Sequence, residues 1–153
     1  MEVMWKLVAA ILNFRLMTSI TFQDFLHKFR AGRGTCTATL EVKLLQQLAA
    51  LRGELLYVIF LYQHKAYDAL YRSRFLEILE GYGVGPQSRR ILQIYWRQIT
   101  MVARSGVYYG MAFQVTPGVV QGDLLYPTIF NVVVDAVVRH WLTGVLTCYY
   151  RSE

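Results

Sequence analysis

The sequence has few of the residues that mark non-globular or metal-bound chains. Of its 153 residues only three are proline, two are cysteine and 17% are charged. Low charge combined with 55% hydrophobic residues excludes a disordered chain, which needs the opposite balance. Eleven glycines and three prolines exclude collagen-like and low-complexity sequence. Length and composition therefore indicate one folded domain with a sizeable core.

The two cysteines, Cys36 and Cys148, are too few and too far apart for a zinc site. We interpret them as reduced thiols of an intracellular protein, in the cytoplasm or the nucleus.

Two apolar windows are the candidates for a membrane span, because the mean hydropathy of +0.30 is high for a soluble domain. Residues 7–12 form a run shorter than the ~18 apolar residues that a spanning helix needs. Residues 128–150 contain Asn131, Asp135, Arg139 and His140, and ionisable groups at mid-span are costly in lipid. We therefore predict no membrane span. A fragment that keeps apolar surface for a missing partner is a further explanation of the hydropathy.

Positive charge is unevenly distributed along the chain. The formal charge is +6, and arginines outnumber lysines twelve to four. Residues 81–122 contain no Asp or Glu. The same stretch contains four arginines and several aromatics, namely Arg89, Arg90, Arg97, Arg104, Tyr95, Trp96, Tyr108 and Tyr109. This mixture is typical of a nucleic-acid surface, although an ordinary solvated face with core aromatics fits equally well.

Hydrophobic spacing predicts a mixed set of elements. Helices are expected at residues 4–16, at 37–51 with Gly53 as the stop, at 72–82, at 88–96 with Ser88 as a candidate N-cap, and at 127–142. The last helix is expected to present Ile129, Val133, Val137 and Trp141 as one stripe. The run at 55–62 predicts a buried strand, and residues 99–104 and 107–115 predict a hairpin around Ser105-Gly106. The predicted fold class is α+β.

Three segments follow one another in an informative order. Residues 29–35 form a basic, glycine-containing loop. Residues 58–68 read Val-Ile-Phe-Leu-Tyr-Gln-His-Lys-Ala-Tyr-Asp, and residues 121–127 read Gln-Gly-Asp-Leu-Leu-Tyr-Pro. This ordered set resembles the reverse transcriptase domain of non-LTR retroelements and group II introns. The resemblance covers residues 1–142 and implies fingers and the first part of a palm, with helices packed on a small antiparallel sheet. Residues 143–153 are expected to be an unrelated tail.

The resemblance places Tyr62 where the family has its first catalytic Asp. Two-metal phosphoryl transfer needs carboxylates that hold Mg²⁺ ions ~3.5–4 Å apart, and a neutral phenol cannot replace one. Asp68 is expected to be structural. The family's Tyr/Phe-x-Asp-Asp hairpin is also missing, because no two Asp are adjacent in this chain. No intact catalytic residue and no metal ligand is therefore assigned, and no cofactor is expected, although the intact family uses Mg²⁺.

Five residues are candidates for nucleotide binding by resemblance. Arg30 and Arg33 match the family's basic fingers segment, where arginine forks and N–H groups hold a triphosphate. A solvated loop is the alternative. Tyr67 matches an aromatic that stacks under the incoming sugar, with a core tyrosine as the alternative. Gln121 and Gly122 match the loop that supports template and nucleotide.

The expected function is that of a truncated, degenerate remnant of an RNA-directed DNA polymerase. We expect no polymerisation, weak and non-specific binding of RNA or DNA, with Arg89, Arg90, Arg97 and Arg104 as candidate contacts, and self-association. Two alternatives stay open. One is a polymerase fragment that another chain completes with an Asp-Asp hairpin, and the other is an orphan hydrophobic protein that associates with a membrane or a partner.

Overall fold

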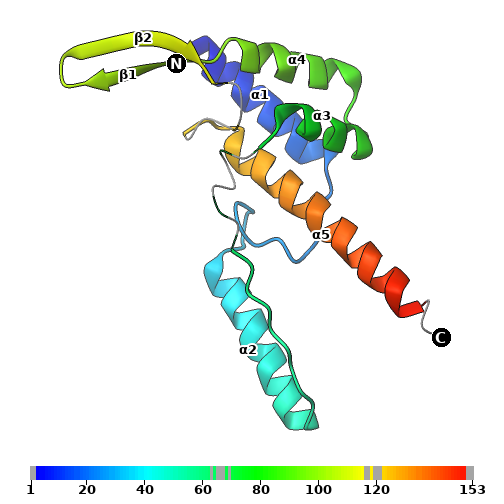
Figure 1. Ribbon diagram of the computed structural model, residues 1–153. Helices are drawn as coiled ribbons and strands as arrows, with labels where there is room; N and C mark the ends of the chain where they lie inside the picture. Colours follow the sequence, from blue (N-terminus) through cyan, green and yellow to red (C-terminus); the bar gives the residue numbers. More distant parts are fainter. Residues whose placement is uncertain are drawn as a thin grey trace. The chain divides into compact units, whose positions relative to one another are not determined.

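The computed structural model of the protein describes residues 3–62, 64, 68, 70–115, 118 and 122–150. The chain forms two compact units, one of residues 1–21 and 65–153 and the other of residues 22–64. The first contains α1 (Val3–Ser19), α3 (Arg72–Gly81), α4 (Pro86–Arg97), α5 (Tyr126–Tyr150), β1 (Thr100–Ser105) and β2 (Tyr108–Gln114), and the second contains α2 (Thr35–Arg52) (Figure 1). The predicted α+β class is confirmed, with five helices and one two-stranded antiparallel sheet in the described part.

The core of the first unit lies among its four helices, which pack against one another. Its buried apolar residues recur at helical spacing and include Leu12 and Leu16 of α1, Phe75 and Leu79 of α3, Leu92 and Trp96 of α4, and Ile129 and Val132 of α5. The rings of Phe75 and Trp96 meet edge to face with centroids 5.9 Å apart. Each such side chain contributes about 1.5–3 kcal/mol when it leaves water, so this helix cluster provides the stability of the unit.

The buried face of α5 is more polar than the sequence predicted. Val137 and Trp141 are exposed. The prediction that they continue the buried apolar face of this helix is therefore wrong beyond the first turns of α5. Asp135 occupies the buried face instead, fully shielded from solvent. It is compensated there because Arg139 Nε lies 2.6 Å from its carboxylate and the Tyr82 hydroxyl donates to the same oxygen. The helix also continues past the predicted end at residue 142 to Tyr150.

A glycine marks the end of α2, and a proline marks the start of α4. As predicted, α2 ends at Gly53, which has a left-handed φ of 67°. The backbone N–H at this cap donates to the carbonyls of Ala49 and Ala50. Ser88 is not an N-cap, because α4 already begins at Pro86 with Gly85 before it. Proline's fixed φ and missing N–H suit the first turn of a helix, so Pro86 starts the helix two residues early.

The predicted hairpin is present. Val102 pairs with Ala112 and Arg104 with Tyr109, so one residue of β1, Ala103, lies opposite two of β2 and forms a β-bulge. Every residue of both strands is exposed. Figure 1 shows the hairpin extending beyond the end of α4. The expected packing of helices on the sheet is therefore wrong for these residues, because the helices bury their apolar faces against one another.

The predicted buried strand at residues 55–62 is also wrong. These residues belong to the second unit, form no strand and are all exposed, with Phe60 89% and Leu61 92% accessible. A strand needs a hydrogen-bonded neighbour, and local β-propensity does not supply one. No helix in the described part of the chain is long and apolar enough to cross a membrane.

Candidate nucleic-acid interface

The end of α4 and the hairpin that follows it carry the exposed part of the basic segment. Arg97 is exposed in the last turn of α4, and Arg104 is exposed on β1. The Arg104 guanidinium lies 5.3 Å from the centre of the Tyr109 ring, its cross-strand partner, and its Nε donates to the carbonyl of Gly106 at 2.9 Å. This arrangement presents a cation and an aromatic face together on a solvent-exposed ribbon.

The four aromatic residues that the sequence analysis named in the basic segment divide into two pairs. Tyr95 and Trp96 are buried in the helix core, so neither can serve as an open stacking platform. Tyr108 and Tyr109 lie on the hairpin and are 79% and 68% exposed. The sequence could not separate these pairs, because both lie in the same acid-free segment.

Of the other two arginines of the segment, only Arg90 is exposed to solvent. Arg89 is partly buried and forms an ion pair with Glu80, at 2.8 Å between Nη1 and Oε2. Its charge is therefore balanced within the protein. Arg90 shares no ion pair or side-chain hydrogen bond with the described residues.

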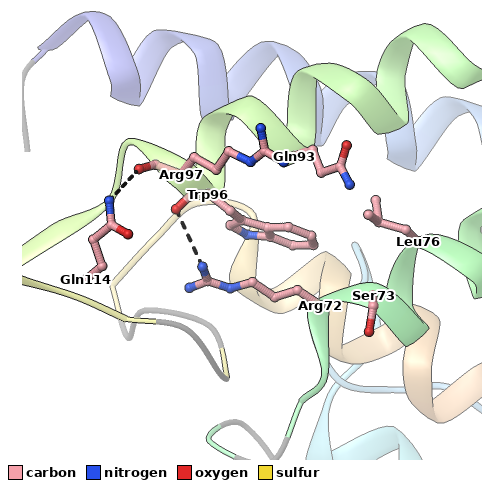
Figure 2. A pocket seen from close by; sticks show the side chains of 7 residues that line it. All are labelled: Arg72, Ser73, Leu76, Gln93, Trp96, Arg97 and Gln114. Atoms are coloured by element: carbon pink, nitrogen blue, oxygen red, sulfur yellow. Dashed lines mark hydrogen bonds between the residues drawn. The ribbon is translucent and has the colours of Figure 1, made fainter.

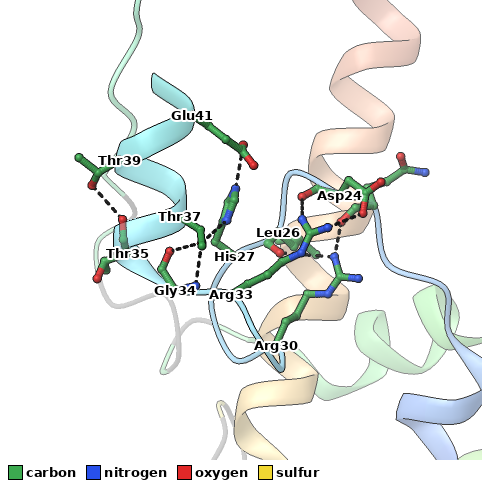
Figure 3. A network of polar contacts seen from close by, with 11 residues as sticks. Asp24, Leu26, His27, Arg30, Arg33, Gly34, Thr35, Thr37, Thr39 and Glu41 are labelled. Atoms are coloured by element: carbon green, nitrogen blue, oxygen red, sulfur yellow. Dashed lines mark hydrogen bonds and ion pairs between the residues drawn. The ribbon is translucent and has the colours of Figure 1, made fainter. Parts of the chain in front are cut away.

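The basic loop of the second unit directs its arginines toward its own backbone. Arg30 donates to the carbonyl of Gln23 at 2.8 Å, and Arg33 forms an ion pair with Asp24 at 2.7 Å (Figure 3). His27 contacts Thr37 and Glu41 of α2 at 2.9 and 3.0 Å (Figure 3). These contacts fix the turn that leads into α2. The signal for this role was Asp24, nine residues before Arg33, but sequence spacing alone does not predict such a pair.

The remaining predicted site residues are divided between the two units and the part of the chain outside the described residues. Tyr62, at the position of the family's Asp, is 90% exposed. Gly122 is exposed with a φ of 93°, which favours glycine. Tyr67 and Gln121 lie outside the described residues.

The carboxylates present do not fit a two-metal site. Within the described ranges no group of three His, Cys, Asp or Glu side chains could hold a metal ion. Asp123 accepts a hydrogen bond from the Tyr95 hydroxyl at 2.9 Å and from the Leu125 N–H at 3.0 Å, and Asp135 is paired with Arg139. Burial and the charge of Asp123 raise the pKa of Tyr95 well above its usual value. Asp123 therefore positions the start of α5, and no metal-dependent step is derived for this chain.

A pocket that the sequence did not indicate lies between α3, α4 and the end of β2. It has a volume of about 240 Å³, and Arg72, Trp96 and Arg97 line it together with Ser73, Leu76, Gln93 and Gln114 (Figure 2). Arg72 holds its position by donating from Nε to the Gly118 carbonyl at 3.0 Å, and its guanidinium lies 5.5 Å from the centre of the Trp96 ring. Arg72 lies outside the acid-free segment, which is why the charge pattern did not single it out.

Comparison with known proteins gives no relative: no family model, no curated protein and no solved structure matches the chain.

Proposed function

We propose that this protein is a remnant of a reverse transcriptase domain that does not polymerise nucleotides but binds single-stranded RNA or DNA weakly and without sequence preference. The polymerase ancestry rests on the order of the sequence segments at residues 29–35, 58–68 and 121–127. The loss of polymerisation rests on Tyr62, which stands where the family has its first catalytic Asp.

The observation that carries the binding proposal is the exposed pair of Arg104 and Tyr109 on the hairpin. Arginine neutralises phosphate and aromatic rings stack on bases of any identity, so such a surface binds strands without reading their sequence. Arg97 adds a second exposed cation, and residues 81–122 contain no carboxylate to repel the strand.

Fluorescence anisotropy with a labelled single-stranded 20-mer tests the proposal. If the arginines of the first unit neutralise about two or three phosphates, log K should fall with log salt at a slope of roughly −1.4 to −2. Affinity should be micromolar or weaker near physiological salt, as for other non-specific contacts. The Arg97→Ala/Arg104→Ala variant should flatten the slope by about one unit or more.

Tyr109→Ala tests the stacking contribution separately from charge. Stacking is worth about 1–3 kcal/mol per base, so this variant should weaken binding about fivefold or more without changing the salt slope. Binding that does not respond to salt, or no binding at low salt, would overturn the proposed function.

A further inference from the structure

The pocket beside Trp96 is cationic, and none of its described lining residues is acidic (Figure 2). Its two charged side chains are Arg72 and Arg97, which approach from α3 and α4. Neither forms an ion pair with any carboxylate of the described residues, whereas Arg33, Arg74, Arg89 and Arg139 all do. Two unneutralised arginines at one pocket favour an anionic occupant.

Arg72 is incompletely satisfied in the present arrangement. Its Nε and Nη1 donate to the carbonyls of Gly118 and Trp96, at 3.0 and 3.4 Å, while its Nη2 is buried and has no hydrogen-bond partner among the described residues. A buried donor without a partner costs about 1–3 kcal/mol. Burial also lowers the pKa of the guanidinium, because desolvation disfavours its charge. An anion in the pocket would offset the cost of desolvating this charge.

The shape and size of the pocket restrict that anion. Its volume of about 240 Å³ is smaller than the ~300–1,000 Å³ of typical sites for drug-sized ligands. Leu76 and Trp96 contribute apolar surface to its lining, and Ser73, Gln93 and Gln114 contribute polar groups. One phosphate with part of its sugar fits this combination, whereas a dinucleotide does not.

We propose that this pocket binds one phosphate group of a nucleotide, with Arg72 and Arg97 as its cationic donors. The phosphate belongs either to a free mononucleotide or to one nucleotide of a bound single strand. Only the second source rests on the function proposed above, so the two can fail separately. Arginine is suited to this role because its planar fork donates two parallel hydrogen bonds to phosphate oxygens.

Isothermal titration at low salt with 5′-AMP and adenosine tests the pocket, since these probes differ only in the phosphate. AMP should bind at least about tenfold more tightly than adenosine, because the arginine contacts are made only by the phosphate. Arg97→Gln should weaken AMP binding about threefold or more. Arg97 is exposed and makes no side-chain hydrogen bond to the described residues, so the substitution should leave the fold intact.

Arg15→Gln is the matched control. Arg15 is an exposed arginine of α1 that does not line the pocket, so this variant removes the same charge from the same unit. It should bind AMP like the wild type. Arg72→Lys keeps the positive charge but removes the planar guanidinium that donates two parallel hydrogen bonds. It should therefore weaken AMP binding more than Arg15→Gln does. Equal affinity for AMP and adenosine, or equal effects of Arg97→Gln and Arg15→Gln, would overturn the pocket proposal.

The labelled 20-mer separates the two sources of phosphate. If Arg72→Lys weakens both AMP and the 20-mer, the pocket takes a nucleotide of the strand. If it weakens AMP alone, the pocket takes a free nucleotide. Salt-dependent binding of the 20-mer without any binding of AMP would overturn the pocket proposal and leave the proposed function standing. Binding of AMP without any binding of the 20-mer would overturn the proposed function and leave the pocket proposal standing.

Discussion

The Tyr95 hydroxyl donates a hydrogen bond to Asp123 at 2.9 Å and so joins the buried face of α4 to the turn that begins α5. Tyr95 is 1% exposed, and Asp123 also accepts from the backbone N–H of Leu125. Tyr95 therefore provides a hydrogen-bond donor to the buried carboxylate of Asp123, which in turn holds the backbone N–H of Leu125 at the start of α5.

Replacing Tyr95 by phenylalanine should destabilise the protein by about 1–2 kcal/mol, because a buried carboxylate oxygen loses its donor. Urea unfolding followed by circular dichroism measures the change. Tyr108→Phe is the control, since Tyr108 is exposed on the hairpin and should cost less than about 0.5 kcal/mol. Equal stability of the two variants would show that the Tyr95–Asp123 bond contributes nothing net.

Alkaline pH should destabilise the fold through Tyr82 and Tyr95. Burial raises the pKa of both phenols, and the neighbouring Asp135 and Asp123 raise each further. Because the folded pKa lies above the unfolded value of about 10, their contribution is complete below that pH and is lost as pH rises toward the folded pKa.

Absorbance at 295 nm measures this titration directly. Tyr82 and Tyr95 should ionise only above the usual pKa of tyrosine, about 10, or on unfolding. The Tyr82→Phe/Tyr95→Phe variant should lose the late phase. Identical titration curves for the wild type and this variant, with unchanged circular dichroism spectra, would contradict the expectation.

Residues 55–62 should cause self-association. They are eight uncharged, exposed residues without proline or glycine, and extended segments of this type pair with copies of themselves. Ile59→Lys/Leu61→Lys should shift sedimentation toward the monomer at micromolar concentration. Leu40→Lys/Leu51→Lys adds the same charge to exposed sites of α2 and should have a smaller effect. A wild-type protein that sediments as a clean monomer would remove the basis for this prediction.

Primer extension on RNA or DNA templates with Mg²⁺ or Mn²⁺ should give no product. Tyr62→Asp should not restore activity, because one carboxylate cannot hold two metal ions. Extension that disappears on substitution within this chain would refute the proposed loss of polymerisation.

Local signals in the sequence predicted the elements that depend on local physics. Helix periodicity predicted α1 to α5, Gly53 marked the end of α2, and the β-rich runs around Ser105-Gly106 predicted the hairpin. The absence of a strand at residues 55–62 was not predictable in this way, because a strand forms only when another segment pairs with it.

The candidate site was predicted only in part for the same reason. Composition indicated Arg97 and Arg104, which the structure leaves exposed. It could not tell that Arg33 is paired with Asp24 or that Arg72 meets Trp96 across two helices, since such contacts depend on tertiary packing.

The bulge opposite Ala103 gives the hairpin one residue more than its cross-strand pairs require. Deletion of the codon for Gly110 would leave a regular ladder in which Arg104 still faces Tyr109. Deletion of Val102 from β1 would instead enlarge the mismatch between the two strands or slip the register, and a slip by one residue moves side chains to the opposite face. In-frame deletions in this hairpin are therefore not equivalent: the additional residue lies on β2, and its loss from β2 does not separate the cation from its ring.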